Sequence, residues 1–224
     1  MATASKQKTV ARSPKQERSR TSLRRLMETA TAILEEESYA DFTLQDLSKR
    51  AKVSIGSIYH LFENKQQLVR EVQVQFLEQI EREHALVINA IRREGLPLRR
   101  LVPLAIRDYS EFLRKNAGML RVFMQIAPTD PVVASNGKKY YHQSVRDFEL
   151  LILDRRAEIR HPDPEHAVTA CYTVMYAAVG RYLGLGTTPD AKGEGDWDTL
   201  IEDLGLMILH FLLGNPDDVR DAKT

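Results

Sequence analysis

The apolar residues of this chain recur mainly at steps of three and four, which is the spacing of one face of an α-helix. The first such stripe predicts a helix that ends at the acidic run 35–38 and contains Leu23, Leu26, Met27, Ala30, Ile33 and Leu34. Residues 1–20, which precede this stripe, are polar, basic and aperiodic, and we expect them to form a flexible arm.

Two short helices with clear starting residues should follow. Thr43 and Asp46 form a capping-box pattern, which predicts a helix that runs to Ala51. Ser54 is an N-cap candidate for a second helix, which should run to about His60. Because only three residues separate the two helices, the pattern predicts a helix-turn-helix.

The rest of the chain keeps this helical periodicity, beginning with a longer helix that Asn64 and Gln67 open. No strand-like alternation is present, so we predict an all-α fold with a helix-turn-helix domain over 21–67 and a second helical domain over 68–224. The later stripes predict helices within 101–112, 118–127, 141–152, 167–183 and 200–211.

The composition is that of a globular protein, with 43% hydrophobic and 28% charged residues. The net charge of +1 conceals an asymmetry, because residues 1–75 contain 13 Lys or Arg and 9 Asp or Glu, whereas residues 76–224 contain 19 and 22. A basic first part on a mildly acidic body is typical of a phosphate-binding surface. A basic tail that is merely solvated is the alternative.

Several function classes are disfavoured. Cys171 is the single cysteine, which excludes an internal disulfide and a cysteine-rich zinc site and makes a reducing, cytoplasmic location the default. The longest apolar stretch, 168–185, contains Arg181 and is a poor membrane span. Segment 161–166 offers His and acidic side chains, but its two prolines predict a turn rather than a metal site. No catalytic motif is present, so we expect no enzyme, metal or cofactor.

The second helix of the helix-turn-helix has an outer face suited to contact with DNA. Its inward positions, and those of the preceding helix, should be Leu44, Leu47, Ala51, Val53, Ile58 and Phe62. On the outer face, Gly56 would let the backbone approach DNA closely. Ser57 can hydrogen-bond a base edge and Ile55 can meet a thymine methyl group. Tyr59 and His60 can reach phosphates.

Basic residues also occupy the starts of two neighbouring helices. Arg24 and Arg25 begin the first helix, and Lys65 begins the one that follows the helix-turn-helix. A cation there destabilises the helix by about 0.3–1 kcal/mol, because it opposes the helix dipole. Departures of this kind from local helix preferences tend to collect at functional sites. Free N–H groups at helix starts bind phosphate, so these residues predict a phosphate clamp.

The run from Thr43 to Leu68 resembles the DNA-binding signature of TetR-family repressors, and the resemblance extends over about 20–77. It rests on Val53, Ser54, Gly56, Ile58, Tyr59, Phe62, Lys65 and Leu68. It implies DNA contacts, mostly to phosphates, from Thr43, Ser54, Gly56, Ser57, Tyr59, His60 and Lys65. Two residues depart from the family pattern. Lys52 stands where glycine is usual, which strains the turn if its φ is positive, and Ile55 replaces a smaller or more polar residue. A helix-turn-helix that serves only as scaffold, with Tyr59 in the core, is the alternative.

The resemblance also implies that a small-molecule effector binds inside the helical body. Aromatic and sulfur-containing side chains at helical spacing are the candidates, with two polar residues as anchors, and a lipophilic effector would suit them. The candidates are Tyr109, Phe112, Met119, Phe123, Met124, Gln125, His142, Phe148, Tyr172, Met175 and Tyr176. Ordinary core packing is the alternative for each of them.

The last two predicted helices combine small and large apolar residues, which allows close approach to a second pair of helices. Paired across a two-fold axis they would form a four-helix bundle, and a buried core pair within one chain is the alternative. The expected interface residues are Ala167, Ala170, Val174, Ala178, Leu204, Ile208 and Phe211.

Together these features predict a homodimeric repressor that binds double-stranded operator DNA with palindromic sequence and is released by a small-molecule effector. Two heads spaced for successive major grooves would lie about 34–36 Å apart. An activator, an architectural adaptor, and a helical enzyme or carrier with a vestigial helix-turn-helix are the alternatives.

Overall fold

The computed structural model describes residues 14–37, 39–186 and 192–214. Within these ranges it contains eight α-helices and one 3-10 turn, with no β-strand, which confirms the all-α prediction. The chain divides into two compact units, residues 1–72 and 73–224. Helix α4 (Lys65–Glu94) begins in the first unit and continues into the second.

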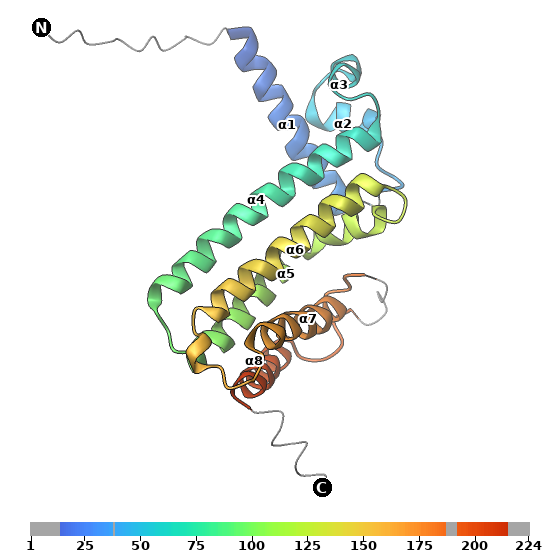
Figure 1. Cartoon of the computed structure of the whole chain (residues 1–224). Helices are drawn as coiled ribbons and strands as arrows, with labels where there is room; N and C mark the ends of the chain where they lie inside the picture. Colours follow the sequence, from blue (N-terminus) through green and yellow to red (C-terminus); the bar gives the residue numbers. More distant parts are fainter. Residues whose placement is uncertain (1–13, 38, 187–191, 215–224) are drawn as a thin grey trace, which may run out of the picture. The chain divides into compact units, whose positions relative to one another are not determined.

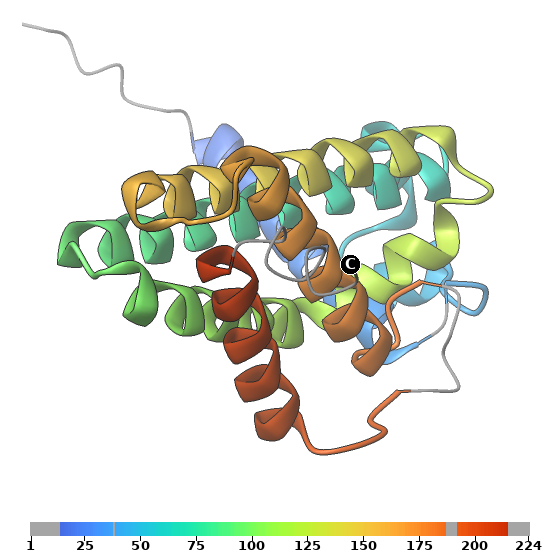
Figure 2. The same cartoon turned by 60° about the horizontal axis from the view of Figure 1, so that its bottom comes forward.

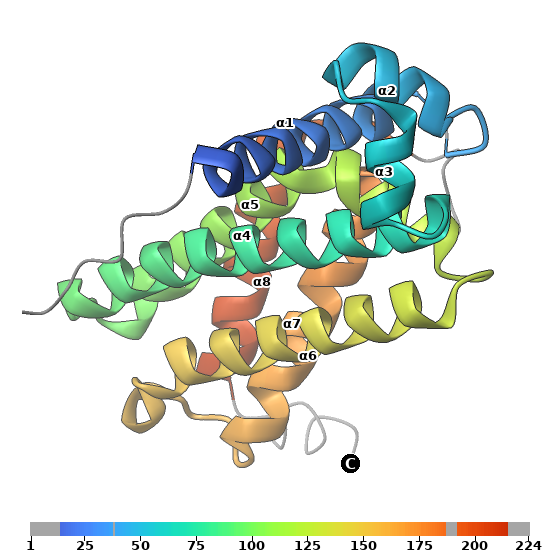
Figure 3. The same ribbon diagram turned by 90° about the horizontal axis from the view of Figure 1, so that it is seen from above.

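The first unit consists of α1 (Pro14–Glu36), α2 (Leu44–Ala51), α3 (Ile55–Leu61) and the first turns of α4. Figure 3 shows α2 and α3 as two short helices joined by a tight turn. The apolar stripe of α1 is buried as predicted, except for the half-buried Leu23. The predicted inward positions of α2 and α3 are all buried as well, and they form one core with Phe42, Leu68 and Val72.

One predicted boundary in this unit is wrong. Helix α1 begins at Pro14, so residues 14–20 belong to a helix and not to a flexible arm. Proline is favoured in the first helical turn, and the Lys, Gln, Glu and Arg that follow are good helix formers even without an apolar stripe. The remainder of the predicted arm, 1–13, lies outside the described residues.

The second unit contains the rest of α4, then α5 (Leu98–Ile126), α6 (Pro131–Leu153), the 3-10 turn η1 (Arg156–Glu158), α7 (Pro164–Tyr182) and α8 (Trp197–Leu213). Helix α5 is central because it contacts α6, α7 and α8, and α7 also contacts α6 and α8. Figure 1 shows α5 and α6 running side by side, and Figure 2 shows α7 and α8 crossing them.

The predicted helix over 118–127 is not a separate element, because α5 runs unbroken from Leu98 to Ile126. A glycine inside a helix costs only about 1 kcal/mol relative to alanine. Residues on both sides of Gly118 are buried, including Leu113, Ala117, Met119 and Leu120. Their burial offsets the cost of Gly118, so the helix continues through it.

Helices α5 and α8 cross at close range. A Cβ added to Gly205 of α8 would lie 3.3 Å from Pro103 Cα of α5, which is tighter than ordinary contact. The indole N–H of Trp197 donates a hydrogen bond to Glu111 Oε1 at 2.7 Å and ties the start of α8 to α5. The small residue and this hydrogen bond therefore fix the register of the two helices.

Candidate nucleic-acid interface and effector cavity

Side-chain caps define the starts of both helices of the helix-turn-helix. The Thr43 hydroxyl accepts a hydrogen bond from the Asp46 N–H at 3.2 Å and caps α2. The Ser54 hydroxyl accepts one from the Ser57 N–H at 3.1 Å and caps α3. Both caps lie where the sequence pattern predicts them. The Ser54 and Ser57 hydroxyl oxygens are 2.7 Å apart, so they share a hydrogen bond at the exposed start of α3.

The turn between these helices contains a strained residue. Lys52 has φ 51° and ψ 44°, and it is the one non-glycine residue of the described chain with positive φ. This confirms the strain expected from the absence of glycine, since the left-handed conformation costs a residue with a Cβ about 1–2 kcal/mol. The Arg25 guanidinium donates to the Lys52 carbonyl at 3.3 Å, and the Ser48 hydroxyl donates to the Val53 carbonyl at 2.7 Å.

The outer face of α3 is open to solvent. It carries the exposed residues Ile55, Gly56, Ser57, Tyr59 and His60. Tyr59 is 54% exposed, whereas Ile58 on the opposite face is fully buried. A Cβ added to Gly56 would meet no atom within 4 Å, and its φ is not positive. Packing within the chain therefore does not require glycine at this position.

Next to this face lies an open hollow on the first unit. It is bordered by Ser22, Lys52, Val53, Ser54, Gly56, Ser57, His60 and Leu61. Because α1 begins at Pro14, Arg24 and Arg25 lie within this helix and not at its start as predicted. Both are exposed, and Arg24 forms a 3.8 Å ion pair with Glu28. The hollow thus combines hydroxyl groups, Lys52 and His60 on a surface of the kind that phosphates contact.

Lys65 differs from the other predicted phosphate ligands because its ammonium group turns toward its own domain. It donates a hydrogen bond to the Tyr39 carbonyl at 2.5 Å, and it lies 4.2 Å from the centre of the Tyr39 ring and 5.4 Å from that of Phe42. Burial lowers the pKa of Lys65, while nearby Asp41 opposes that shift. Lys65 therefore ties the start of α4 to the segment that follows α1.

Arg50 is a cation of the first unit that the sequence reasoning did not single out. Its guanidinium donates to Glu36 at 2.9 Å and also pairs with Glu37, and these hydrogen bonds raise its pKa. Both carboxylates belong to the acidic run at the end of α1. Arg50 is therefore engaged in joining α1 to α2, and the acidic run has a structural partner.

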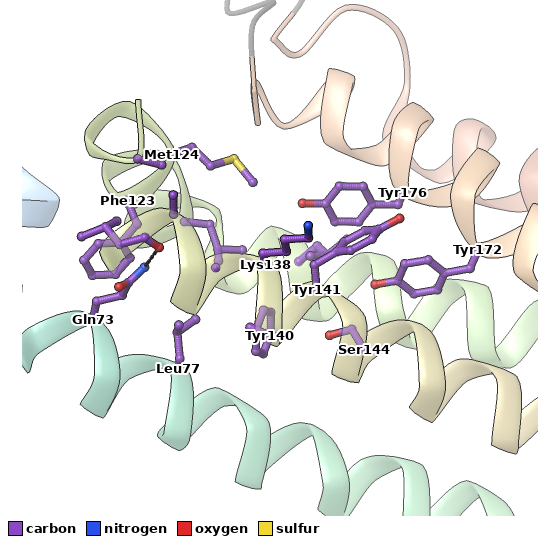
Figure 4. Close-up of a pocket in the computed structure, with 16 residues that line it drawn as sticks. Gln73, Leu77, Phe123, Met124, Lys138, Tyr140, Tyr141, Ser144, Tyr172 and Tyr176 are labelled. Atoms are coloured by element: carbon purple, nitrogen blue, oxygen red, sulfur yellow. Dashed lines mark hydrogen bonds between the residues drawn. The ribbon is translucent and has the colours of Figure 1, made fainter. Parts of the chain in front are cut away.

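The second unit contains a partly open cavity of about 280 Å³ between α4, α5, α6 and α7 (Figure 4). Four of the predicted effector residues line it, namely Phe123, Met124, Tyr172 and Tyr176. The other lining residues are Gln73, Leu77, Leu113, Leu120, Ala127, Val133, Ala134, Gly137, Lys138, Tyr140, Tyr141 and Ser144. Sequence reasoning did not assign these to the cavity, although the adjacent pair Tyr140 and Tyr141 in mid-helix was a usable signal.

The remaining predicted effector residues lie elsewhere. Tyr109, Met119, Phe148 and Met175 are buried in the core, and Phe112 is half-buried against it. The two expected polar anchors, Gln125 and His142, are exposed and do not line the cavity. For these seven residues the geometry favours packing or solvent contact, because none of them faces the cavity.

The phenol groups at the cavity are neutral hydrogen-bonding groups. Burial raises the pKa of Tyr140, Tyr172 and Tyr176, and for Tyr140 and Tyr172 a hydrogen bond with Ser144 partly offsets the rise. Tyr141 contacts Tyr172 and Tyr176 edge to face, with centroids 5.8 and 5.1 Å away, and Tyr172 and Tyr176 are stacked with centroids 6.1 Å apart. The cavity wall is thus a set of packed aromatic rings with polar tips.

Two helices of the second unit share an exposed apolar surface. Val174 of α7 is 51% exposed, and Met207 and Phe211 of α8 are 63% and 43% exposed. A groove of about 230 Å³ between the helices is lined by Ala170, Cys171, Val174, Leu204, Met207, Ile208 and Phe211. Five of the seven predicted interface residues line this groove. Ala178 is half-buried, and Ala167 is fully buried within the chain.

Other sites considered from sequence remain unremarkable in the described part of the chain. No group of three or more His, Cys, Asp or Glu residues there has a metal-binding arrangement. Cys171 is buried, and burial raises the pKa of its thiol to about 12. His161 lies in a turn, where its ring accepts a hydrogen bond from the Asp163 N–H. No helix of the described residues is long and apolar enough to span a membrane.

Comparison with known proteins agrees with this architecture. Residues 26–72 match the family described as bacterial regulatory proteins, tetR family. No curated protein matches the chain in sequence. A structure described as a TetR-family transcriptional regulator from Mesorhizobium loti aligns with a TM-score of 0.71 at 16% identity, over 87% of this chain and 96% of that one.

Two further solved structures have the same fold. A TetR transcription regulator from Haloarcula marismortui aligns with a TM-score of 0.61 at 14% identity, over 86% of this chain and 97% of that one. The regulator FadR from Bacillus subtilis, in complex with stearoyl-CoA, aligns with a TM-score of 0.55 at 17% identity, over 86% and 98%. The family match assigns residues 26–72 to the DNA-binding domain of the tetR family of bacterial regulatory proteins, and the chain shares the all-helical fold of these regulators.

Proposed function

We propose that the chain is a homodimeric repressor that binds a palindromic operator through α3 and leaves it when a small molecule occupies the cavity of the second unit. The observation that carries the DNA-reading part is the outer face of α3. Polar and apolar side chains, together with a glycine that internal packing does not require, lie exposed on this one short helix.

We assign separate tasks to the residues of this face. Ser57 and Ile55 would read base edges in the major groove, where hydroxyl groups and thymine methyl groups provide the contacts. Tyr59, His60, Thr43 and the exposed Arg24 and Arg25 of α1 would hold phosphates and so set the orientation without reading sequence. Gly56 would allow the backbone to approach the duplex.

The exposed apolar surface of α7 and α8 supports the proposed dimer. Val174, Met207 and Phe211 place large apolar side chains in solvent around one groove. Contiguous exposed apolar surface of this kind marks an interaction site in a soluble protein. A second copy supplies the same surface across a two-fold axis, and two recognition helices then read the two halves of a palindrome.

Effector control is supported by the cavity. It lies between helices of a bundle, which is a usual place for a ligand, and its wall is mostly apolar with a few polar tips. FadR of the same fold has bound stearoyl-CoA, so this fold can hold a ligand. We propose no enzymatic activity for the chain.

The experiment begins with selection of bound sequences from random duplexes and measurement of affinity for the selected operator at several salt concentrations. We expect the affinity to fall steeply with salt, because phosphate contacts release counterions. Tyr59→Ala should lower the affinity, whereas Leu86→Ala, which changes a residue 71% exposed on α4, should not. Failure to select any sequence, or a flat salt dependence, would contradict the proposal.

The dimer is tested in the same protein by sedimentation. We expect the full chain to sediment as a dimer, and Met207→Glu to shift it toward monomer because a charge would be buried in an apolar interface. A monomeric wild-type chain that still protects a palindrome would refute the assignment of α7 and α8.

A further inference from the structure

The cavity of the second unit has two chemically different ends, and this difference indicates the chemical groups that a ligand should have. Figure 4 shows Leu77, Phe123 and Met124 on one side and the rings of Tyr141, Tyr172 and Tyr176 on the other. Lys138 and Tyr140 lie between these groups in the same view. A ligand that fills the cavity therefore places one part against apolar side chains and another against polar tips.

The polar end carries positive charge. Among the lining residues in the described part of the chain, Lys138 is the one charged side chain, and none is Asp or Glu. Aromatic rings can also surround a cation, but a cationic ligand would meet the Lys138 ammonium with no carboxylate to balance it. An anionic group instead pairs with Lys138 and accepts hydrogen bonds from the phenols, which are strong because one partner is charged.

The amide of Gln73 does not compete for this role. Its Nε2 donates to the Val133 carbonyl at 3.0 Å, and its Oε1 accepts from Asn136 Nδ2 at 3.2 Å. These bonds hold α4 to the start of α6 at the apolar end. The ligand is therefore recognised by shape and apolar contact at this end, and by Lys138 and the phenols at the other.

Size and wall chemistry narrow the ligand class further. The cavity volume of about 280 Å³ lies near the lower limit of the volumes usual for small-molecule sites, so the cavity suits a small ligand. At the apolar end, Phe123 adds an aromatic ring to the wall beside Leu77 and Met124. A ligand ring placed against Phe123 gains an aromatic contact, whereas a flexible alkyl chain loses rotational freedom when it is bound.

We propose that the effector is a small aromatic monocarboxylate, whose ring lies against Leu77, Phe123 and Met124 and whose carboxylate meets Lys138 and the phenols of Tyr172 and Tyr176. This assignment rests on the proposed role of the cavity as the effector site. It names the chemical class of ligand that the residues of this chain select.

The test uses the full-length protein and isothermal calorimetry with benzoate, salicylate, phenylacetate and cinnamate, each beside its neutral amide. Octanoate serves as an alkyl acid of matching size. At least one aromatic acid should bind roughly tenfold or more tightly than its amide, because the amide lacks the charge, and it should also bind more tightly than octanoate. Equal binding of acid and amide, tighter binding of octanoate, or no binding by any of the acids would overturn the proposal.

Two lysine variants locate the carboxylate. Lys138→Gln should weaken binding of the acid several-fold and leave binding of the amide unchanged. The neighbouring Lys139→Gln is the matched control, since Lys139 is also exposed but does not line this cavity, and it should bind the acid as wild type does. Equal losses in the two variants would show that general surface charge, not this site, attracts the acid.

Release from DNA is measured separately by adding the same acid to the protein–operator complex. An acid that binds and depends on Lys138 but leaves the complex intact would refute the effector role while the ligand class stands. Release of DNA by a compound whose binding is insensitive to Lys138 would refute the ligand class and leave effector control standing.

Discussion

His84 is buried against aromatic rings of α5, and its titration should make the protein less stable below neutral pH. Its ring lies between two aromatic rings of α5, stacked on Phe112 and edge-on to Tyr109, each with centroids 4.3 Å away. Its Nε2 atom is buried and has no hydrogen-bond partner among the residues that the structure describes. Burial lowers the pKa of His84 from 6.5 to about 4, because desolvation disfavours the imidazolium.

The magnitude follows from proton linkage. The unfolded chain binds a proton at His84 below pH 6.5, whereas the folded chain does so only near pH 4. The stabilising effect of a neutral His84 is therefore complete above pH 6.5 and is lost as the pH falls toward 4. Each pH unit within that window removes about 1.4 kcal/mol, so the loss at pH 5 is about 2 kcal/mol.

The perturbation is His84→Phe, which keeps a ring against Phe112 and removes the titrating group. Urea unfolding of wild type and variant at pH 8 and pH 5 gives the free energies of unfolding. We expect the wild type to lose about 2 kcal/mol more than the variant between the two pH values. His142→Gln, which replaces an exposed histidine, should follow the wild type. Parallel curves for wild type and His84→Phe would refute the reasoning.

Three other substitutions test the helix-turn-helix. Lys52→Gly should raise the free energy of unfolding by about 0.5–1 kcal/mol in urea unfolding, because relief of the left-handed strain exceeds the entropic cost of glycine; a loss of stability would show that Lys52 is not strained. Lys65→Met should lower the free energy of unfolding by about 1 kcal/mol, because the variant loses the hydrogen bond to the Tyr39 carbonyl. It should also lower operator affinity, because this bond ties the start of α4 to the segment that follows α1. Arg24→Ala should lower operator affinity in fluorescence anisotropy while stability stays within about 0.5 kcal/mol, as Arg24 is exposed. If Arg24→Ala and Lys65→Met had the same effects on stability and on operator affinity, the assignment of Arg24 to phosphate contact and of Lys65 to a structural contact would be wrong.

The helix-turn-helix was predictable because its signals are local. A hydroxyl or amide side chain before each helix caps free N–H groups within three residues, and Thr43 and Ser54 do so as predicted. The inward positions follow from helical spacing alone. Lys65 shows the limit of this reasoning, since its contact with Tyr39 spans 26 positions and depends on how the segment after α1 folds.

The cavity was only partly predictable for a related reason. Helical spacing tells which side chains face other helices, but not where the packing between helices leaves a space. Met119 and Met175 have the same spacing and chemistry as Met124, yet they are fully buried and Met124 lines the cavity. Gln73 reaches the cavity through a hydrogen bond to Val133, 60 positions away, which no local pattern indicates.

The central claim is that α3 reads bases while its neighbours hold phosphates, and binding-site selection with variants tests it most directly. Wild type should select a palindrome whose half-site centres are separated by about 10 base pairs or a multiple of that spacing. Ser57→Ala and Ile55→Ala should each change the preferred base at one position per half-site, whereas Arg24→Ala should lower affinity for all sequences alike. If these α3 variants selected the same bases as the wild type, α3 would not be the reading helix.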